Sequence, residues 1–181
     1  MKGIIFTDFL EMVESMYGLQ VVDTIIENSQ LPSEGIYTSV GTYSFNEMLS
    51  LLTNLSAEVN TPASDLIYAL GLYLFDGLSK SHPEVIESYS SPIDLLYAIE
   101  DHIHVHVKKL YPGAELPSFK ILEKSDTSIV MIYSSSRGLY RLEQGLIEKT
   151  FEHFNGKCSL SYEVLKEDGT EVKFDIVHDA Y

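Results

Sequence analysis

The feature that most constrains this chain is a change in the period of its apolar residues at Pro112-Gly113. Before that pair, apolar residues recur every three to four positions, which predicts helices. After it, short segments at 119–123 and 128–133 predict strands, and two further strands flank Asp168-Gly169, a strong hairpin signal. Helices followed by antiparallel strands, with one helix between them, predict an α+β fold.

Local signals set the ends of the predicted helices. Ser44 and Glu47 have the spacing of a capping box. Thr61-Pro62 and Ser91-Pro92 each combine a capping residue with a proline suited to the first helical position. Gly18 ends the first helix. The predicted helices cover residues 4–16, 21–27, 44–59, 61–78, 91–111 and 139–154.

The composition narrows the class of function. The chain has 181 residues, and no change in composition marks a linker, so we expect residues 1–181 to form one domain. A net charge of −15, from 12 basic and 27 acidic residues, argues against nucleic-acid binding and against adsorption to anionic lipid. Such a surface suits a basic patch on a protein partner.

The cysteine count and the apolar runs indicate the compartment. Cys158 is the only cysteine, which excludes an internal disulfide and a cysteine-only zinc site. No apolar run approaches the roughly 18 residues that a membrane span needs. We therefore expect a cytoplasmic protein with no membrane segment.

Three of the six histidines lie in the segment DHIHVH at 101–106. In a strand they would share one face, as in the metal-binding strands of zinc and iron enzymes. In a helix, His104 points away from the other two. The cap at Ser91 and the absence of Pro or Gly from 93 to 111 favour the helix. The alternative function is a metalloenzyme that binds its metal through His102, His104 and His106.

On that helix, His104 is a lone imidazole on an apolar face. It shares a stripe with Ile93, Tyr97, Val107 and Tyr111. Spacing alone leaves two roles for it, a hydrogen-bonded core residue or an axial ligand to a metal cofactor. His102 and His106 fall on the polar side, as solvated residues or as a zinc-binding pair.

Tyr133, Ser135 and Arg137 alternate in the segment SIVMIYSSSR and so share one face of an extended chain. An arginine fork binds a carboxylate or phosphate in bidentate fashion, and hydroxyls add donors to the same oxygens. The face reads either as a strand end becoming a polar turn or as an anion clamp beside an apolar pocket. Haem, a flat apolar ligand with two carboxylates, needs both a pocket and a clamp.

The two sites in this order resemble the haem nitric oxide/oxygen binding (H-NOX) family, which includes the haem domain of soluble guanylate cyclase and stand-alone bacterial sensors. The resemblance covers the whole chain. It is carried by the MKGIIF start, by DHIH at 101–104 followed by YPG at 111–113 and LPSF at 116–119, and by the Y-x-S-x-R motif ending at Arg137. The spacing to Tyr111 selects His104 as the proximal ligand.

The resemblance implies haem b between a helical N-terminal part and a C-terminal part with a four-stranded antiparallel sheet and helices. It implies that Tyr133, Ser135 and Arg137 hold the propionates and that Pro117 presses on the macrocycle. Phe9, Phe75 and Leu142 fall where the family lines its distal pocket.

The resemblance also bears on gas choice. Members that bind dioxygen carry a distal tyrosine, and by spacing from Arg137 that position is Leu142, whereas Tyr140 lies two residues off on another helix face. We therefore expect a sensor that binds nitric oxide and carbon monoxide and discriminates against dioxygen. It is not expected to be an enzyme. The family's usual partners imply a histidine kinase or a cyclic-di-GMP enzyme.

Overall fold

The computed structural model describes residues 1–179, so residues 180 and 181 of the expected 1–181 domain lie outside the described part. Helices precede a four-stranded antiparallel sheet, which confirms the predicted α+β class. No helix within residues 1–179 is long and apolar enough to cross a bilayer. The helices are α1 (Gly3–Tyr17), α2 (Leu19–Glu27), α3 (Phe45–Val59), α4 (Ala63–Ser81), α5 (Pro83–Ile86), α6 (Pro92–Tyr97), the π-helix η1 (Ile99–Ile103), α7 (His104–Leu110) and α8 (Tyr140–His153).

The sheet has the strand order β1-β2-β4-β3. Its strands are β1 (Ser118–Lys124), β2 (Ser128–Ser134), β3 (Cys158–Val164) and β4 (Glu171–His178). The predicted hairpin joins β3 to β4, and Gly169 there has a positive φ of 72° that favours glycine. β2 is an inner strand, and its Tyr133 lies opposite Phe119 on one neighbour and Val172 on the other.

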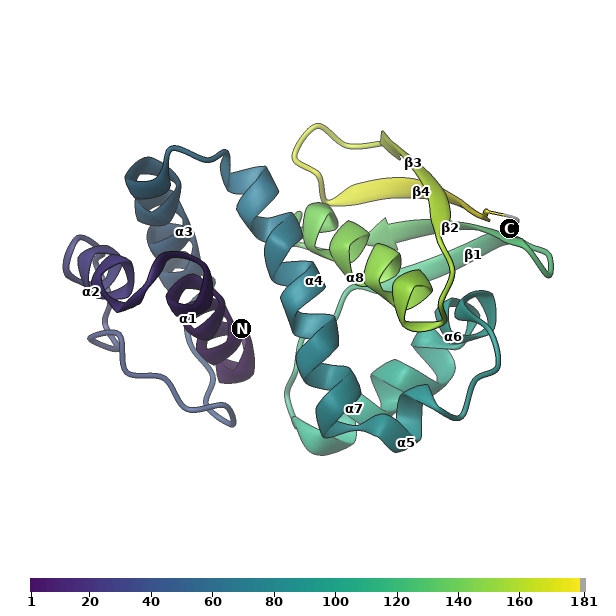
Figure 1. Cartoon of the computed structure of the whole chain (residues 1–181), viewed down its shortest axis with the longest axis horizontal. Coiled ribbons are helices and arrows are strands. Elements are labelled where there is room, and N and C mark those ends of the chain that lie inside the picture. The colour runs from purple at the N-terminus through teal and green to yellow at the C-terminus, as the bar shows by residue number, and fades with distance from the viewer. Residues whose placement is uncertain (180–181) are drawn as a thin grey trace.

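Two apolar cores share one helix. The first lies among α1 to α4, and the second lies between the sheet and α8. Leu142 belongs to the first core, whereas Ile147 and Phe151, further along α8, belong to the second. Figure 1 shows α4 and α8 in the middle of the molecule, between α1–α3 and the sheet. α8 therefore links the helical part to the sheet.

The capping box at the start of α3 is half correct. The Ser44 hydroxyl accepts a hydrogen bond from the Asn46 amide at 3.2 Å, as a cap does. The Glu47 carboxylate does not turn back to the helix start. It is buried, and it accepts hydrogen bonds from the Ser33 amide and hydroxyl and from the Tyr37 hydroxyl. A buried carboxylate needs several donors, and the loop before α3 supplies them.

The start of α4 also differs from the prediction. Pro62, not Thr61, precedes the first helical residue, and the Thr61 hydroxyl donates to the Val59 carbonyl instead of capping α4. The helix then runs past the predicted end at 78 to Ser81. The short α5 follows at once, with Pro83 at its first position, where a proline is well tolerated.

The predicted helix over 91–111 is interrupted. Its start is correct, because the Ser91 hydroxyl accepts from the Asp94 amide at 3.1 Å. Beyond Tyr97 the backbone widens into η1, where the Ile103 amide bonds to the Ala98 carbonyl five residues back. The extra residue per turn rotates the side chains after η1 relative to those of α6, so the predicted stripe is not continuous. The stripe is also wrong at Tyr97, the last residue of α6, which is 54% exposed.

α4 and α8 approach each other closely at two glycines. A Cβ added to Gly71 would overlap the Leu142 carbonyl oxygen, and one added to Gly145 would overlap the Tyr68 carbonyl oxygen. Small residues at a crossing let two helix backbones come together. No sequence pattern predicts this contact, since an isolated glycine within a helix usually only lowers the stability of that helix.

Gly71→Ala should lower the free energy of unfolding by about 1–3 kcal/mol, because the methyl group must push two backbones apart. Gly77→Ala is the matched control on the same helix. Its Cβ would meet only an Asp8 carboxylate oxygen at 3.7 Å, so it should gain up to about 1 kcal/mol of helix propensity. Urea midpoints of the two variants check this, and equal shifts would contradict the close crossing.

Candidate functional site

A cavity of about 290 Å³, called the large cavity below, lies between α1 and α4 on one side and α7, β1 and β2 on the other. Its size is near the lower end of small-molecule sites, roughly 300–1,000 Å³, and apolar side chains make most of its wall. It brings together seven of the eight residues selected from the sequence. These are Phe75, His104, Pro117, Tyr133, Ser135, Arg137 and Leu142.

His104 is the first residue of α7 and is only 9% exposed. Its Nδ1 lies 3.4 Å from Oε1 of Glu100, one turn earlier, and the same oxygen accepts the Phe119 amide at 2.7 Å. Burial lowers the pKa of His104, so its imidazole is neutral near pH 7. A carboxylate at Nδ1 leaves Nε2 as the nitrogen available to a metal.

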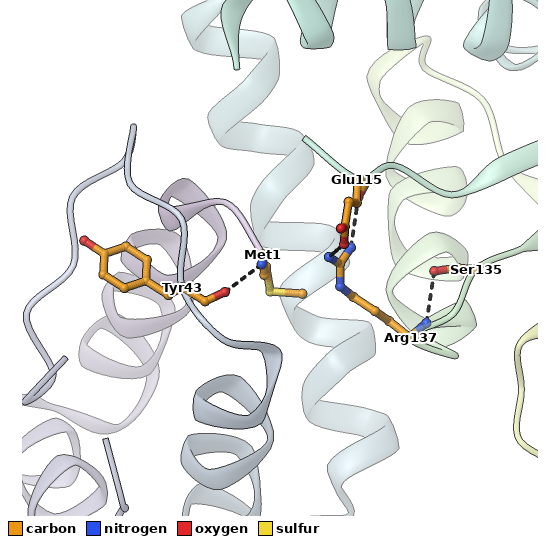
Figure 2. A network of polar contacts seen from close by, with 5 residues as sticks. All are labelled: Met1, Tyr43, Glu115, Ser135 and Arg137. Carbon is orange, nitrogen blue, oxygen red and sulfur yellow. Dashed lines mark hydrogen bonds and ion pairs between the residues drawn. The ribbon is translucent and has the colours of Figure 1, made fainter. Parts of the chain in front are cut away.

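Arg137 lies just beyond the end of β2, and its side chain is 14% exposed. Figure 2 shows the side chain extending toward Met1 and Glu115. Its guanidinium donates to the Glu115 carbonyl at 2.9 Å and to the Glu115 carboxylate. Glu115 is 77% exposed, so the fork binds a carboxylate whose own side chain is held by little else.

Two hydroxyls complete this end of the large cavity. The Tyr133 hydroxyl accepts from the Leu139 amide at 3.0 Å, and burial raises the pKa of Tyr133 to about 12, so the phenol keeps its proton. The Ser135 hydroxyl accepts from the Arg137 amide at 3.3 Å. Both oxygens accept from the backbone, so each hydroxyl keeps a proton that can rotate toward an anion beside Arg137.

The residues expected near the gas-binding side divide between two cavities. Phe75 and Leu142 line the large cavity. Phe9 does not; it lines an adjoining cavity of about 10 Å³, which shares Leu142. Tyr140 lies in neither, because its ring packs on Tyr162 with centroids 5.2 Å apart. Its separation from Leu142 therefore agrees with the helix projection.

Glu143 is an acidic residue in the large cavity that the sequence analysis missed. Burial raises its pKa to about 8, so the carboxyl is largely protonated at neutral pH. It follows Leu142 directly in α8 and lines the same cavity. The sequence signal for Glu143 was an acidic residue on the otherwise apolar face of the predicted helix. For Glu100, the signal was the i,i+4 spacing to His104.

The three clustered histidines do not share a face. His102 is exposed and its Nδ1 contacts the Tyr89 hydroxyl, whereas His104 faces the large cavity. The expectation that His106 is solvated is wrong, because its Nε2 is buried without a hydrogen-bond partner and its ring packs on His82. The segment is helical, so a strand-based metal site is excluded. His102 contacts Tyr89 and His106 packs on His82, so the two do not form the alternative zinc-binding pair in this structure.

The donor set fits haem. A flat apolar ring needs an apolar cavity, its iron needs a neutral imidazole, and its two carboxylates need charged and hydroxyl donors at one edge. The large cavity has all three, with His104 on α7 and with Tyr133, Ser135 and Arg137 around the end of β2. Arg137 already binds a carboxylate, that of Glu115, which is the chemistry a propionate requires.

Comparison with known proteins identifies the family. A family model described as haem-NO-binding matches residues 2–162. The chain belongs to the haem-NO-binding (H-NOX) family. It is similar to the unliganded Fe(II) H-NOX protein from K. algicida, with 50% identity and a TM-score of 0.97 over 100% of this chain and 98% of that one.

Two further H-NOX structures extend the likeness. One is the S. oneidensis protein in the Fe(II)NO state, 29% identical with a TM-score of 0.91, covering 99% of this chain and 100% of that one. The other is the IWP-051-bound protein from Shewanella woodyi in the Fe(II)CO state, 37% identical with a TM-score of 0.83, covering 98% and 94%. The chain is thus a haem-binding gas-sensor domain of a family of sensors, not enzymes.

Arg137→Ala should weaken haem retention, because it removes the largely buried positive charge that we expect to bind a propionate. A charge-assisted hydrogen bond contributes about 1.5–3 kcal/mol, which corresponds to roughly 10- to 100-fold faster haem loss to an acceptor such as apomyoglobin. Tyr133→Phe and Ser135→Ala should each have smaller effects. The control is Arg141→Ala, since Arg141 pairs with Asp65 outside the large cavity. Unchanged haem loss in Arg137→Ala would contradict the clamp.

Proposed function

We propose that this chain is a haem b-based nitric oxide sensor that discriminates against dioxygen and passes its ligand state to a partner signalling protein. The observation that carries the proposal is that His104 and Arg137 face one apolar cavity that Phe75 and Leu142, which have no hydrogen-bond donor, also line. The similar proteins from S. oneidensis and S. woodyi, in Fe(II)NO and Fe(II)CO states, support it. We propose further that residues 1–181 act as one haem-binding domain in the cytoplasm.

Each site residue has a proposed role. Haem iron, when bound, supplies the metal that takes a diatomic gas. His104 would hold the iron through Nε2 while Glu100 orients its ring, because a metal-bound imidazole needs a partner at its other nitrogen. Arg137, Tyr133 and Ser135 would hold the propionates, and Pro117, in the cavity wall, would press on the ring.

Gas choice follows from what the residues around Leu142 can donate. Bound dioxygen acquires negative charge, so a nearby hydrogen-bond donor stabilises it, while nitric oxide depends on such a donor far less. Phe75 and Leu142 have none, and the protonated carboxyl of Glu143 in the same cavity wall is the donor that the spectrum in air tests. The Thr150 hydroxyl, elsewhere in the cavity wall, already donates to the Leu146 carbonyl at 2.8 Å.

Signal transmission would use the helix that bears His104. α7 follows the π-helix η1, which Glu100 ties to the first strand through the Phe119 amide. Loosening the link between His104 and the iron would let α7 shift relative to α1 and α4 across the cavity. A partner that prefers one arrangement would read the change. We propose a histidine kinase or a cyclic-di-GMP enzyme, docked through a basic patch because this chain carries a net charge of −15.

The absorption spectrum of the ferrous protein tests the gas choice. We expect nitric oxide and carbon monoxide each to shift the Soret band, and we expect air to leave the unliganded spectrum in place until slow oxidation begins. A stable dioxygen spectrum would contradict the proposal. If that spectrum then disappeared in Glu143→Leu, the protonated Glu143 carboxyl would be the donor.

A further inference from the structure

A second group of metal-ligating side chains lies at the corner between α4 and α5. His82 ends α4, Glu84 lies in the first turn of α5, and His106 comes from α7. One ligand atom from each lies within 4.8 Å of the other two. Nδ1 of His82 is 3.7 Å from Oε1 of Glu84, and the rings of His82 and His106 have centroids 5.7 Å apart.

One ring nitrogen of His106 lacks a hydrogen-bond partner at this corner. Its Nε2 is buried and has no hydrogen-bond partner, a costly state for a polar atom. His106 comes two residues after His104 on α7, and its ring packs on that of His82 where the α4–α5 corner meets the large cavity, which both histidines also line. A cation at the corner would give the buried nitrogen a partner.

Two imidazoles and one carboxylate form a ligand set used for zinc and related late transition metals. Tetrahedral zinc with ligand bonds near 2.0–2.1 Å needs ligand atoms roughly 3.3 Å apart. The three atoms are within 4.8 Å, so rotation of the half-exposed His82 and exposed Glu84 side chains is enough to close the site. The fourth position is left to water.

We propose that His82, Glu84 and His106 bind one zinc-like divalent cation, which fastens α7 to the α4–α5 corner. This site shares no ligand with the haem residues. The metal joins α7, which begins at His104, to the α4–α5 corner. It therefore restrains the movement of α7. If the proposed sensing function holds, on which this consequence rests, zinc opposes the shift of α7 and reduces the response of a partner to nitric oxide.

Calorimetric titration of the haem-loaded, chelator-treated protein with ZnCl₂ tests the site. We expect one equivalent to bind, and we expect His82→Ala and His106→Ala each to weaken binding by at least about 10- to 100-fold. Glu84→Gln should weaken it less. The control is His102→Ala, in the same segment but exposed and outside the group, which should leave zinc affinity unchanged. Mg²⁺ should not bind, because it prefers oxygen ligands.

Hydrogen exchange gives a second readout. Zinc should slow exchange of the α7 and α5 amides in the unaltered protein and not in His106→Ala. Circular dichroism shows that each variant is folded, and an unchanged Soret band in Glu84→Gln, whose side chain does not line the large cavity, shows that the haem site is intact when zinc affinity falls. The inference is overturned if zinc does not bind, or if His102→Ala and His106→Ala lose affinity equally. The nitric oxide spectrum is recorded separately, so failure of the sensing function is distinguishable from failure of the zinc site.

Discussion

His104→Gly should abolish the protein-derived iron ligand, and added imidazole should restore it. The reason is local: His104 is a buried, neutral imidazole at the wall of the large cavity, with Glu100 beside Nδ1. Glycine removes the imidazole ring and its methylene, so it leaves a space that free imidazole can fill, with Glu100 still present to orient it. The measurement is the ferrous absorption spectrum with and without about 10 mM imidazole. This concentration is above the dissociation constant expected for such a small ligand.

His102→Gly is the matched control, because it places the same backbone change two residues away at an exposed side chain. We expect its spectrum to equal that of the unaltered protein. A wild-type spectrum from His104→Gly without imidazole would show that another residue holds the iron. His106, which also lines the large cavity, would be the first to examine.

Leu142→Tyr should convert the ferrous protein into one that binds dioxygen in air. Leu142 is 9% exposed and lines both the large and the small cavity, so a tyrosine there can reach into the gas-binding space. Its hydroxyl would donate to the negative charge that develops on bound dioxygen. A hydrogen bond to a charged group contributes about 1.5–3 kcal/mol, or roughly a 10- to 100-fold gain in dioxygen affinity.

Leu142→Phe separates the hydroxyl from the added bulk. It fills the same space without a donor, so its dioxygen affinity should match that of the unaltered protein. The measurement is the dioxygen dissociation rate by flash photolysis and the spectrum in air. Equal affinities for Leu142→Tyr and Leu142→Phe would mean that this position does not face bound gas.

The helix and strand ends that could be predicted are those set by local chemistry. Ser91 caps α6 through the Asp94 amide, and Asp168-Gly169 turns the β3–β4 hairpin, because each depends on residues within a few positions. The π-helix at 99–103 could not be predicted. It depends on contacts distant in sequence, including the bond between Glu100 and the Phe119 amide. Glu47 is similar, because its donors come from a loop that no period describes.

The residues of the candidate site that could be predicted from the sequence are those that lie within one helix turn or on one strand face. Tyr133, Ser135 and Arg137 alternate along the end of β2 and line the same cavity as His104. The sequence could not predict that Glu115 pairs with Arg137 or that His82 contacts His106. Each of these two contacts joins residues more than 20 positions apart, and no local sequence pattern predicts such a contact.

The order in which the large cavity is built along the chain has a consequence for biosynthesis. Its wall includes Ile4 and Ile5 from the first helix and Ile147 and Thr150 from α8. A nascent chain therefore cannot enclose the cofactor until residues near 150 have left the ribosome, by which time α1 to α4 can already have packed together. Until haem binds, the unfilled cavity would lower the stability of each newly made molecule. The haem supply at that time would therefore decide whether the molecule matures or is degraded.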